Sequence, residues 1–350
     1  MKYLLSLTVA FLVLGTACAD YASDAESAIK LLQDKWYSTE TGLWDDMWWQ
    51  SGNIVETIAK FGKQDADFKQ AAIDIISNTY DKSANQKGYK AWKNDFYDDE
   101  GWWAMGWIAS YDLTGDQKYL DTAKDLFEDM TGGWSTPCNG GIWWNKPKES
   151  IAIISNELFL AVGASLANRV AAADKANYQN WAQMEWDWLF HSGIINNASL
   201  VNDGIDKSSC QNNAQTTWTY NQGVILTGLS ELARATSDGG FIAHANNLAR
   251  ASTATLSDSG VLTEPAAHPL DQQSGMFKGA YVRGLSALNA NEPQAAYADF
   301  LRKNAESLVR NARGADGAFA DRWQGGSAGM SAASHAAGID VLVAAMRASM

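Results

Sequence analysis

The sequence is poor in several residues and motifs that often reveal function. Its 350 residues include 3 cysteines, 5 prolines and 4 histidines. The histidines are scattered and form no His-Glu-x-x-His pattern, so we expect neither a metal site nor a cofactor. A phosphate-binding Gly-rich loop of the expected form is also missing, which argues against nucleotide hydrolysis. The net charge of −13 would repel nucleic acid or an anionic membrane, and a neutral ligand is therefore expected.

Long apolar runs are absent beyond the N-terminus. Lys2, an apolar run from Leu4 to Leu14 and the small-residue pattern Ala17-Cys18-Ala19 are typical of a secretory signal peptide over residues 1–19. The run is shorter than the roughly 20 residues that a membrane span needs. We therefore expect the mature chain to be extracellular or associated with a cell wall, with no membrane contact once the leader is removed. A lipoprotein anchored at Cys18 is the alternative.

Removal of the leader leaves two cysteines, Cys138 and Cys210. An even number in an oxidising compartment predicts one disulfide that closes a long loop, with two separate buried thiols as the alternative. Asn197-Ala198-Ser199 is a sequon for N-glycosylation, which a eukaryotic host would use. No Ser-, Gly- or Pro-rich linker interrupts residues 20–350, so we expect one domain, acting as a monomer.

Apolar residues recur with a helical period along the chain, while strand patterns are nearly absent, which predicts an all-α protein. One set of segments is apolar on nearly every face, as buried helices are: Asp46 to Lys60, Glu100 to Tyr111, Ser155 to Val170, Thr219 to Ala235, Met276 to Leu288 and Ala333 to Arg347. A second set is amphipathic with charged outer faces: Ala25 to Trp36, Asp67 to Asp81, Lys118 to Met130, Tyr178 to Phe190, Ile242 to Thr255 and Tyr297 to Arg310.

The two sets alternate and repeat at intervals of roughly 55 residues, longer than the unit of common solenoids. Six hairpins of one buried and one amphipathic helix predict an (α/α)6 barrel, in which six inner helices are ringed by six outer ones. An open helical solenoid is the alternative. In the barrel, the loops that lead into the inner helices share one rim. Five of these loops are rich in Trp, Asp, Asn and Gln, which predicts a binding site at that rim.

Asp98 and Asp99 place two adjacent carboxylates beside Trp102 and Trp103. A carboxylate pair cleaves glycosidic bonds, and aromatic faces hold sugars. Neighbouring side chains at a helix start stay within roughly 5 to 6 Å, the separation of a retaining mechanism. We predict that Asp98, near the helix amides, keeps a low pKa and acts as nucleophile, while Asp99 is desolvated against the indoles and acts as general acid/base. Simple helix capping is the alternative.

Substrate-binding candidates lie in the same loops and at the starts of the inner helices. They are Asp45, Asp46, Trp102, Trp143, Trp144, Asn156, Trp218, Tyr220, Asn221, Gln222 and Lys278. Asp45 and Asp46 form a second acidic pair, and spacing does not decide which pair carries the chemistry. The tryptophans number 16 and often occur in pairs, more than a core alone would need. Each is a candidate stacking platform or a core residue.

Several motifs resemble, in order, those of glycoside hydrolase family 76, the endo-α-1,6-mannanases. They are Tyr97 to Ala104, Gly140 to Trp144, Ser155 to Phe159, Trp218 to Gly223 and Phe277 to Gly279. The resemblance covers essentially the whole mature chain. It implies an (α/α)6 barrel that cleaves the α-1,6-linked backbone of fungal or yeast mannan with retention. It also implies that the first aspartate of the pair is the nucleophile and the second is the acid/base.

The resemblance leaves other functions open. Members of the fungal branch are thought to act as transglycosylases on glycolipid-anchored mannoproteins, usually with a C-terminal anchor signal. Residues 344–350 show no polar spacer and apolar tail, so a freely secreted hydrolase is expected. A non-catalytic mannan-binding protein of the same fold is a further alternative. A magnesium-dependent lyase or cyclase is disfavoured, because no Asp-Asp-x-x-Asp run occurs.

Overall fold

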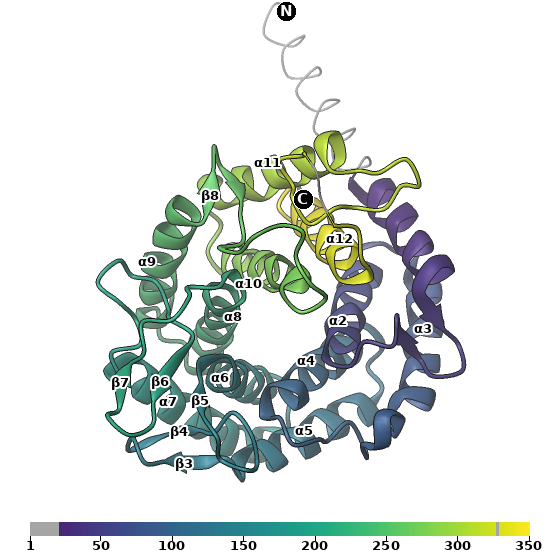
Figure 1. The fold of residues 1–350 in the computed structure, drawn as a ribbon. Coiled ribbons are helices and arrows are strands. Elements are labelled where there is room, and N and C mark those ends of the chain that lie inside the picture. Colours follow the sequence, from purple (N-terminus) through teal and green to yellow (C-terminus); the bar gives the residue numbers. More distant parts are fainter. Residues whose placement is uncertain (1–20, 327–328) are drawn as a thin grey trace, which may run out of the picture.

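The computed structural model describes residues 21–326 and 329–350, so the predicted leader lies outside the described residues. Helices dominate and form two concentric rings (Figure 1). The inner ring consists of α2 (Trp49–Gln64), α4 (Tyr97–Thr114), α6 (Ile153–Ala167), α8 (Thr219–Thr236), α10 (Phe277–Asn291) and α12 (Ala332–Arg347). The outer ring consists of a helix over residues 21–36, α3 (Lys69–Ser83), α5 (Gln117–Thr131), α7 (Ala172–His191), α9 (Gly240–Thr255) and α11 (Ala295–Asn311).

The inner ring is closed. Each inner helix packs against the next one along the chain, and α12 packs against α2 (Figure 1). An open solenoid would leave the first and last helices apart, so the closure excludes that alternative. The predicted (α/α)6 barrel is confirmed.

Every predicted helix is present, with ends that differ by a few residues. The expected start of the first inner helix at Asp46 is wrong, because α2 begins at Trp49. Asp45 and Asp46 have φ angles of 50° and 54°, in the left-handed region that a right-handed helix excludes. Both aspartates therefore belong to the loop before the helix.

Burial explains why the inner helices lack a polar face. All 15 residues of α6 are buried, because α4 and α8 flank it in the ring and α7 covers its outer side. Where α8 and α10 cross, Gly223 faces Gly284, and a Cβ on either glycine would overlap backbone of the other helix. The absence of side chains at these two positions lets the helices approach closely.

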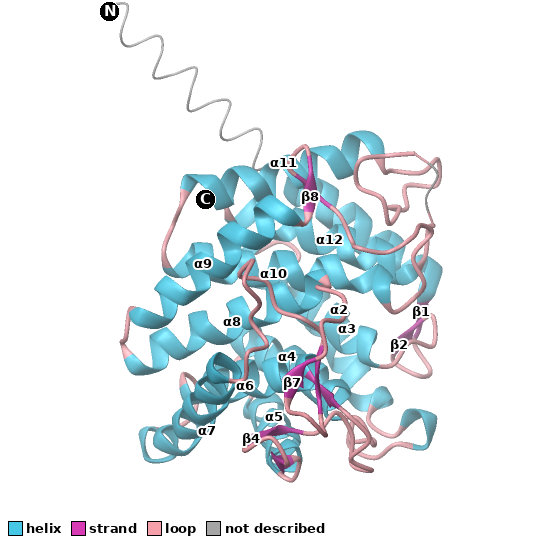
Figure 2. Ribbon diagram, turned by 60° about the vertical axis from the view of Figure 1, so that its left-hand side comes forward, coloured by secondary structure: helices cyan, strands magenta, loops and turns pink. Residues whose placement is uncertain are grey.

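The strands are short and lie in the loops that lead into inner helices (Figure 2). They pair antiparallel as β1 (Tyr37–Ser38) with β2 (Leu43–Trp44), β3 (Trp134–Thr136) with β4 (Gly140–Ile142), β5 (Ile151–Ala152) with β6 (Gly204–Asp206) and β7 (Gln211–Asn212), and β8 (Ser257–Asp258) with β9 (Val261–Leu262). These small sheets stiffen the loops at one end of the barrel.

The predicted disulfide is confirmed. Cys138, in the turn between β3 and β4, is bonded to Cys210, which lies between β6 and β7 and 72 residues further along the chain. The indole Nε1 of Trp188 donates to the carbonyl of Cys138 at 3.0 Å. The bond therefore ties the loop before α6 to the loop before α8, and Trp188 of α7 supports the Cys138 side.

Arg283 of α10 joins three inner helices at the point where the ring closes. Its guanidinium lies 3.0 Å from Glu56 of α2 and 2.5 Å from Asp340 of α12. All three side chains are at most 5% exposed. Lys60 also pairs with Glu56, and Thr57 donates to Asp340. A buried arginine with two carboxylates and further donors is held in one geometry, since losing either partner would leave a buried charge unpaired.

Replacing Arg283 by methionine should lower the free energy of unfolding by about 3 to 5 kcal/mol, because Asp340 would keep a buried charge without its cation. Urea unfolding followed by circular dichroism measures the change. Arg310→Met, at an exposed position in the last turn of α11, is the matched control and should change it by less than about 0.5 kcal/mol. Equal stability of the two variants would show that Arg283 does not hold the ring closed.

Candidate active site

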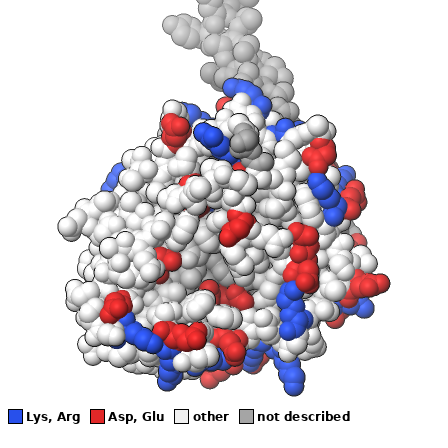
Figure 3. All heavy atoms as spheres, in the orientation of Figure 1, with Lys and Arg blue, Asp and Glu red and all other residues white. Residues whose placement is uncertain are grey.

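The loops at the N-terminal ends of the inner helices surround a cleft of about 430 Å³. Figure 3 shows acidic side chains around a hollow on this face of the molecule. Aromatic rings from five different segments line the cleft: Trp49, Trp102, Trp144, Tyr220 and Phe277. Tyr220 and Phe277 stack with ring centroids 4.0 Å apart, and Trp49 stacks on Trp102 at 5.5 Å. The predicted rim site therefore exists as an aromatic cleft.

Asp98 lies in the first turn of α4 and its side chain lines the cleft. The indole Nε1 of Trp144 donates to its Oδ2 at 3.3 Å. Burial raises the pKa of Asp98 to about 6, and the nearby charge of Asp203 raises it too, while amides of the helix start and the Trp144 N–H act in the opposite direction. The low pKa predicted for this carboxylate is wrong, because desolvation outweighs the helix amides.

Asp99 is half-buried and does not belong to the side chains that line the cleft. Its Oδ2 accepts from the amide of Asn94 at 2.5 Å. Burial raises the pKa of Asp99 well above its usual value, and the charge of Asp98 raises it further. Neither aspartate caps α4, since the residue before the helix is Phe96 and makes no side-chain cap. Two adjacent carboxyls therefore sit in unlike surroundings, and Asp99 is the one that holds its proton at higher pH.

A second carboxylate that lines the cleft, Asp203, was not found by the sequence analysis. Its Oδ1 accepts from the hydroxyl of Tyr220 at 2.8 Å and from the amide of Asn221 at 3.0 Å. Burial and the charge of Asp203 raise the pKa of Tyr220 well above its usual value, so this phenol remains a donor. The two donors from α8 fix the orientation of the Asp203 carboxylate in the cleft.

Paired tryptophans divide between the cleft and the core. Trp49 and Trp102 line the cleft, while their neighbours Trp48 and Trp103 pack against each other with ring centroids 5.2 Å apart. Successive residues of a helix point about 100° apart, so one member of each pair faces the barrel axis and the other faces the outer layer. The expectation that tryptophans serve more than the core therefore holds for Trp49 and Trp102, which line the cleft, and fails for Trp48 and Trp103, which pack in the core.

Several predicted binding residues instead support the cleft from behind. Asn156 bonds the N–H and the carbonyl of Ile142 at 2.7 and 3.1 Å. Gln222 holds both backbone groups of Val201 at 2.9 and 2.8 Å, and Asn221 orients Asp203 as described. These amides attach loops to the first turns of α6 and α8, so their role is positioning rather than direct lining of the cleft.

The remaining candidates are scattered. Lys278 is fully buried, donates to the backbone carbonyl of Asp321 and lies over the Trp323 ring at 4.1 Å, so it does not line the cleft. Trp143 is buried with the Lys207 ammonium 5.8 Å from its ring. Trp218 is half-buried and meets Phe277 edge-on at 5.6 Å.

Asp45 and Asp46 are exposed at the rim, outside the cleft. Asp46 pairs with Lys87 at 2.6 Å, and Asp45 accepts from Gln272 at 2.8 Å. Both carboxylates therefore have protein partners that fasten neighbouring loops. Of the two acidic pairs in the sequence, only Asp98-Asp99 contributes a side chain to the cleft.

The family model for glycosyl hydrolase family 76 matches residues 17–349. The chain belongs to this family. Mannan endo-1,6-alpha-mannosidase DCW1 of Candida albicans is 28% identical over 220 residues, which are 56% of this chain and 48% of that protein. Mannan endo-1,6-alpha-mannosidase DFG5 of Saccharomyces cerevisiae is 24% identical over 240 residues, 62% of this chain and 51% of that protein. The chain thus spans about half the length of the curated relatives it matches.

Solved structures of the family share the fold. An inactive variant of the α-1,6-mannanase GH76A of Salegentibacter sp. HEL1_6, with two consecutive aspartates changed to alanine, is bound to α-1,6-mannotetrose. It is 22% identical, with a TM-score of 0.83 over 93% of this chain and 98% of that chain. Dfg5 of Chaetomium thermophilum in complex with glucosamine is 19% identical, with a TM-score of 0.79 over 95% and 90% of the two chains.

Among residues 21–326 and 329–350, no group of three or more His, Cys, Asp or Glu side chains is arranged to hold a metal ion. The helices in that part of the chain do not combine the length and apolar character of a membrane span. Asn197 is exposed, and its glycosylation stays a prediction.

Sequence reasoning missed Trp49, Asp203, Gln273 and Phe277 as cleft residues of this family 76 protein. Trp49 and Phe277 are the first residues of α2 and α10, the same place in the hairpin as Tyr97 in α4. Alignment of the hairpin starts could therefore have found them. Asp203 lies just before β6 and carried no comparable signal.

Replacing Trp144 by phenylalanine keeps an aromatic ring but removes the N–H that stabilises ionised Asp98. The pKa of Asp98 should rise from about 6, by roughly half a unit to one unit. On acidification, the activity of the variant should therefore begin to fall at a higher pH than that of the intact protein. The pH profile of kcat/KM on a mannan substrate measures this shift of the acidic limb. Trp143→Phe, which removes an indole N–H from the neighbouring residue, is the control and should leave the acidic limb where it is in the intact protein. An acidic limb at the same pH in both variants would contradict the assignment.

Proposed function

We propose that the chain is a secreted glycoside hydrolase that cleaves α-1,6-mannosidic bonds within the backbone of fungal or yeast mannan, with retention of anomeric configuration. The observation that carries the proposal is the adjacent pair Asp98 and Asp99, whose pKa values are both raised but to different extents beside an aromatic cleft. Family membership and the names of the relatives support the choice of substrate. The inactive Salegentibacter variant, altered at two consecutive aspartates, supports the choice of residues.

In this proposal Asp98 is the nucleophile. With a pKa of about 6 it is mostly ionised at neutral pH, and the Trp144 N–H holds one oxygen while the other is left without a partner. The free oxygen attacks the anomeric carbon as the glycosidic C–O bond breaks. The product of this step is a glycosyl ester on Asp98.

Asp99 then serves as general acid and base. Its raised pKa keeps it protonated, so it donates its proton to the departing glycosidic oxygen in the first step. In the second step the Asp99 carboxylate takes a proton from water, the resulting hydroxide attacks the anomeric carbon, and Asp98 is released. Two displacements restore the original configuration.

The cleft walls supply binding. The stacked pair Tyr220 and Phe277 and the pair Trp49 and Trp102 offer ring faces to sugar units. Asp203, whose Oδ1 is held by Tyr220 and Asn221, offers its other carboxylate oxygen as an acceptor for sugar hydroxyls. We further propose a single catalytic domain over residues 20–350, a monomeric state and an extracellular or cell-wall location. The leader-like N-terminus and the Cys138–Cys210 bond support export.

Asp98→Asn and Asp99→Asn should each lower kcat on linear α-1,6-mannan by at least about 10³-fold while retaining affinity for α-1,6-mannotriose, because asparagine neither attacks nor transfers a proton. Reducing-sugar assays and calorimetry measure the two quantities. Asp116→Asn, at the N-cap of α5, is the control for an aspartate that only caps a helix. Turnover by the Asp98 or Asp99 variants equal to that of the Asp116 variant would refute the catalytic role of that aspartate. Binding of mannotriose without turnover by the intact protein would indicate a non-catalytic binding protein.

The anomer released first distinguishes the retaining mechanism. Proton NMR during early hydrolysis of α-1,6-mannan should show the α-anomer before mutarotation, since two displacements occur at the same carbon. Early β-anomer would refute the nucleophile assignment. Products longer than an oligosaccharide substrate would reveal glycosyl transfer, and cleavage of another polysaccharide alone would keep the mechanism and change the substrate.

A further inference from the structure

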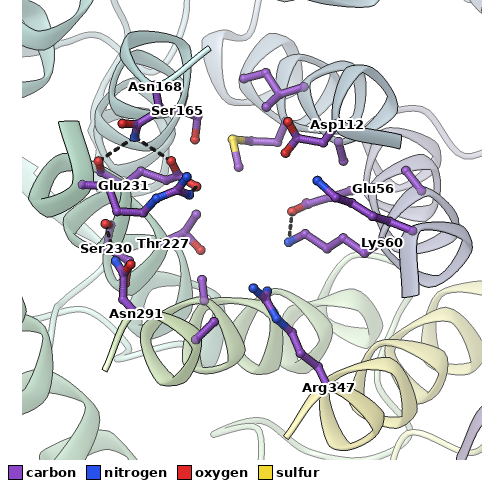
Figure 4. A pocket seen from close by; sticks show the side chains of 18 of the residues that line it. Glu56, Lys60, Asp112, Ser165, Asn168, Thr227, Ser230, Glu231, Asn291 and Arg347 are labelled. Atoms are coloured by element: carbon purple, nitrogen blue, oxygen red, sulfur yellow. Dashed lines mark hydrogen bonds and ion pairs between the residues drawn. The ribbon is translucent and has the colours of Figure 1, made fainter. Parts of the chain in front are cut away.

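A second and larger cavity lies at the opposite end of the barrel. Its volume is about 700 Å³, and residues of all six inner helices or of the segments that follow them line it. Figure 4 shows these side chains pointing toward a common centre. The cavity and the cleft have no lining residue in common, since Trp102 faces the cleft while Met105, one turn further along α4, faces the cavity. The second cavity is therefore separate from the proposed catalytic site.

The cavity is rich in positive charge, although the whole chain carries a net charge of −13. Five basic and three acidic side chains line it: Lys60, Lys63, Arg169, Arg234 and Arg347, with Glu56, Asp112 and Glu231. The carboxylates are occupied by internal partners. Glu56 pairs with Lys60 at 2.5 Å, and Arg169 binds Asp112 at 2.7 Å and Glu231 at 3.1 Å. The basic side chains thus exceed the acidic ones by two.

Arg347, in the last turn of α12, is the clearest example of a basic side chain in excess of the acidic ones. Figure 4 shows its guanidinium reaching into the cavity. Among the described residues it has no carboxylate within ion-pair distance. Desolvation and the positive charge of Arg234 lower the pKa of Arg347, while the charge of Glu231 raises it, and Glu231 is already shared between Arg234 and Arg169. Two guanidiniums that repel each other across a cavity form a site that an anion would stabilise.

The lining does not suit a neutral sugar. No aromatic side chain belongs to it, in contrast to the cleft, so no stacking surface is present for a sugar ring. The volume is in the range of small-molecule sites, which leaves room for an organic group beside an anionic one. We propose that this cavity binds a phosphate group, free or as a phosphate ester, between Arg347 and Arg234, with Lys63 as a further cation.

A simpler explanation is that these cations only offset the partial negative charge at helix C-termini. Lys63, Arg234 and Arg347 do lie in the last turns of α2, α8 and α12. The outer helix α11 also has an arginine in its last turn, Arg310, which is exposed like Lys63, Arg234 and Arg347 but does not line the cavity. Arg310→Gln removes the same helix-end charge without touching the cavity, and it is therefore the matched control.

Isothermal titration calorimetry of the full chain at constant ionic strength tests the site with three probes: inorganic phosphate, a hexose 6-phosphate and the same hexose without phosphate. The intact protein should bind a phosphate-bearing probe saturably. Arg347→Gln and Arg234→Gln should each weaken that binding by at least about tenfold, because a charge-assisted hydrogen bond is lost. Arg347→Lys should bind more weakly than the intact protein, since lysine lacks the two-pronged geometry. Arg310→Gln should bind as the intact protein does.

The outcomes distinguish a phosphate ester from free phosphate as the ligand, and they test the alternatives to a phosphate site. Tighter binding of the ester than of inorganic phosphate indicates an organic ligand, and equal binding indicates that the phosphate group alone is recognised. Absence of saturable binding to the intact protein, equal weakening in Arg310→Gln, or hexose binding as strong as that of its phosphate would overturn the proposal. Circular dichroism and melting temperatures confirm that each variant is folded.

Discussion

The closure of the inner ring at Arg283 is the constraint on which the structure depends. The two carboxylates it binds come from the first and last inner helices, Glu56 of α2 and Asp340 of α12. At the other side of the barrel Arg169, just after α6, binds Asp112 of α4 and Glu231 of α8 in the same manner. Two arginines thus bridge helices that are not adjacent in sequence. The Arg283 cluster joins the middles of its three helices, and the Arg169 cluster joins helices near the ends opposite the cleft, so the N-terminal ends of the inner helices meet around one cleft.

Much of the fold could be predicted because buried helices leave a direct record in the sequence. An inner helix such as α6 touches protein on every side, so its residues are apolar or small throughout, while an outer helix such as α5 keeps one charged face. The disulfide followed from an even cysteine count. The loops were less predictable. Their short strands and the left-handed residues Asp45 and Asp46 are imposed by pairings with distant segments, which a local pattern does not contain.

The site was predictable where helix geometry decides and unpredictable where tertiary contacts decide. Asp98 was found because an adjacent pair of carboxylates stands beside tryptophans at the start of an inner helix, and this combination is visible in the sequence. Asp203 was missed because its position depends on the pairing of β6 with β5 and on two donors from α8. Lys278 was placed in the cleft because it lies at the start of an inner helix, within a motif that resembles those of the family, whereas Trp323 and the backbone carbonyl of Asp321 enclose it.

The packing along the barrel axis decides how a long chain could use the cleft. Trp102, Met105 and Arg283 meet on that axis, and only about 10 Å³ remains between them and their neighbours. This gap is too small for a sugar ring, so the hole in the ribbon drawing is sealed by side chains. Under the proposed function, a polymer would lie across the mouth of the cleft instead of passing through the barrel. It would need no free end to enter, and both fragments would leave from the face at which the intact strand bound.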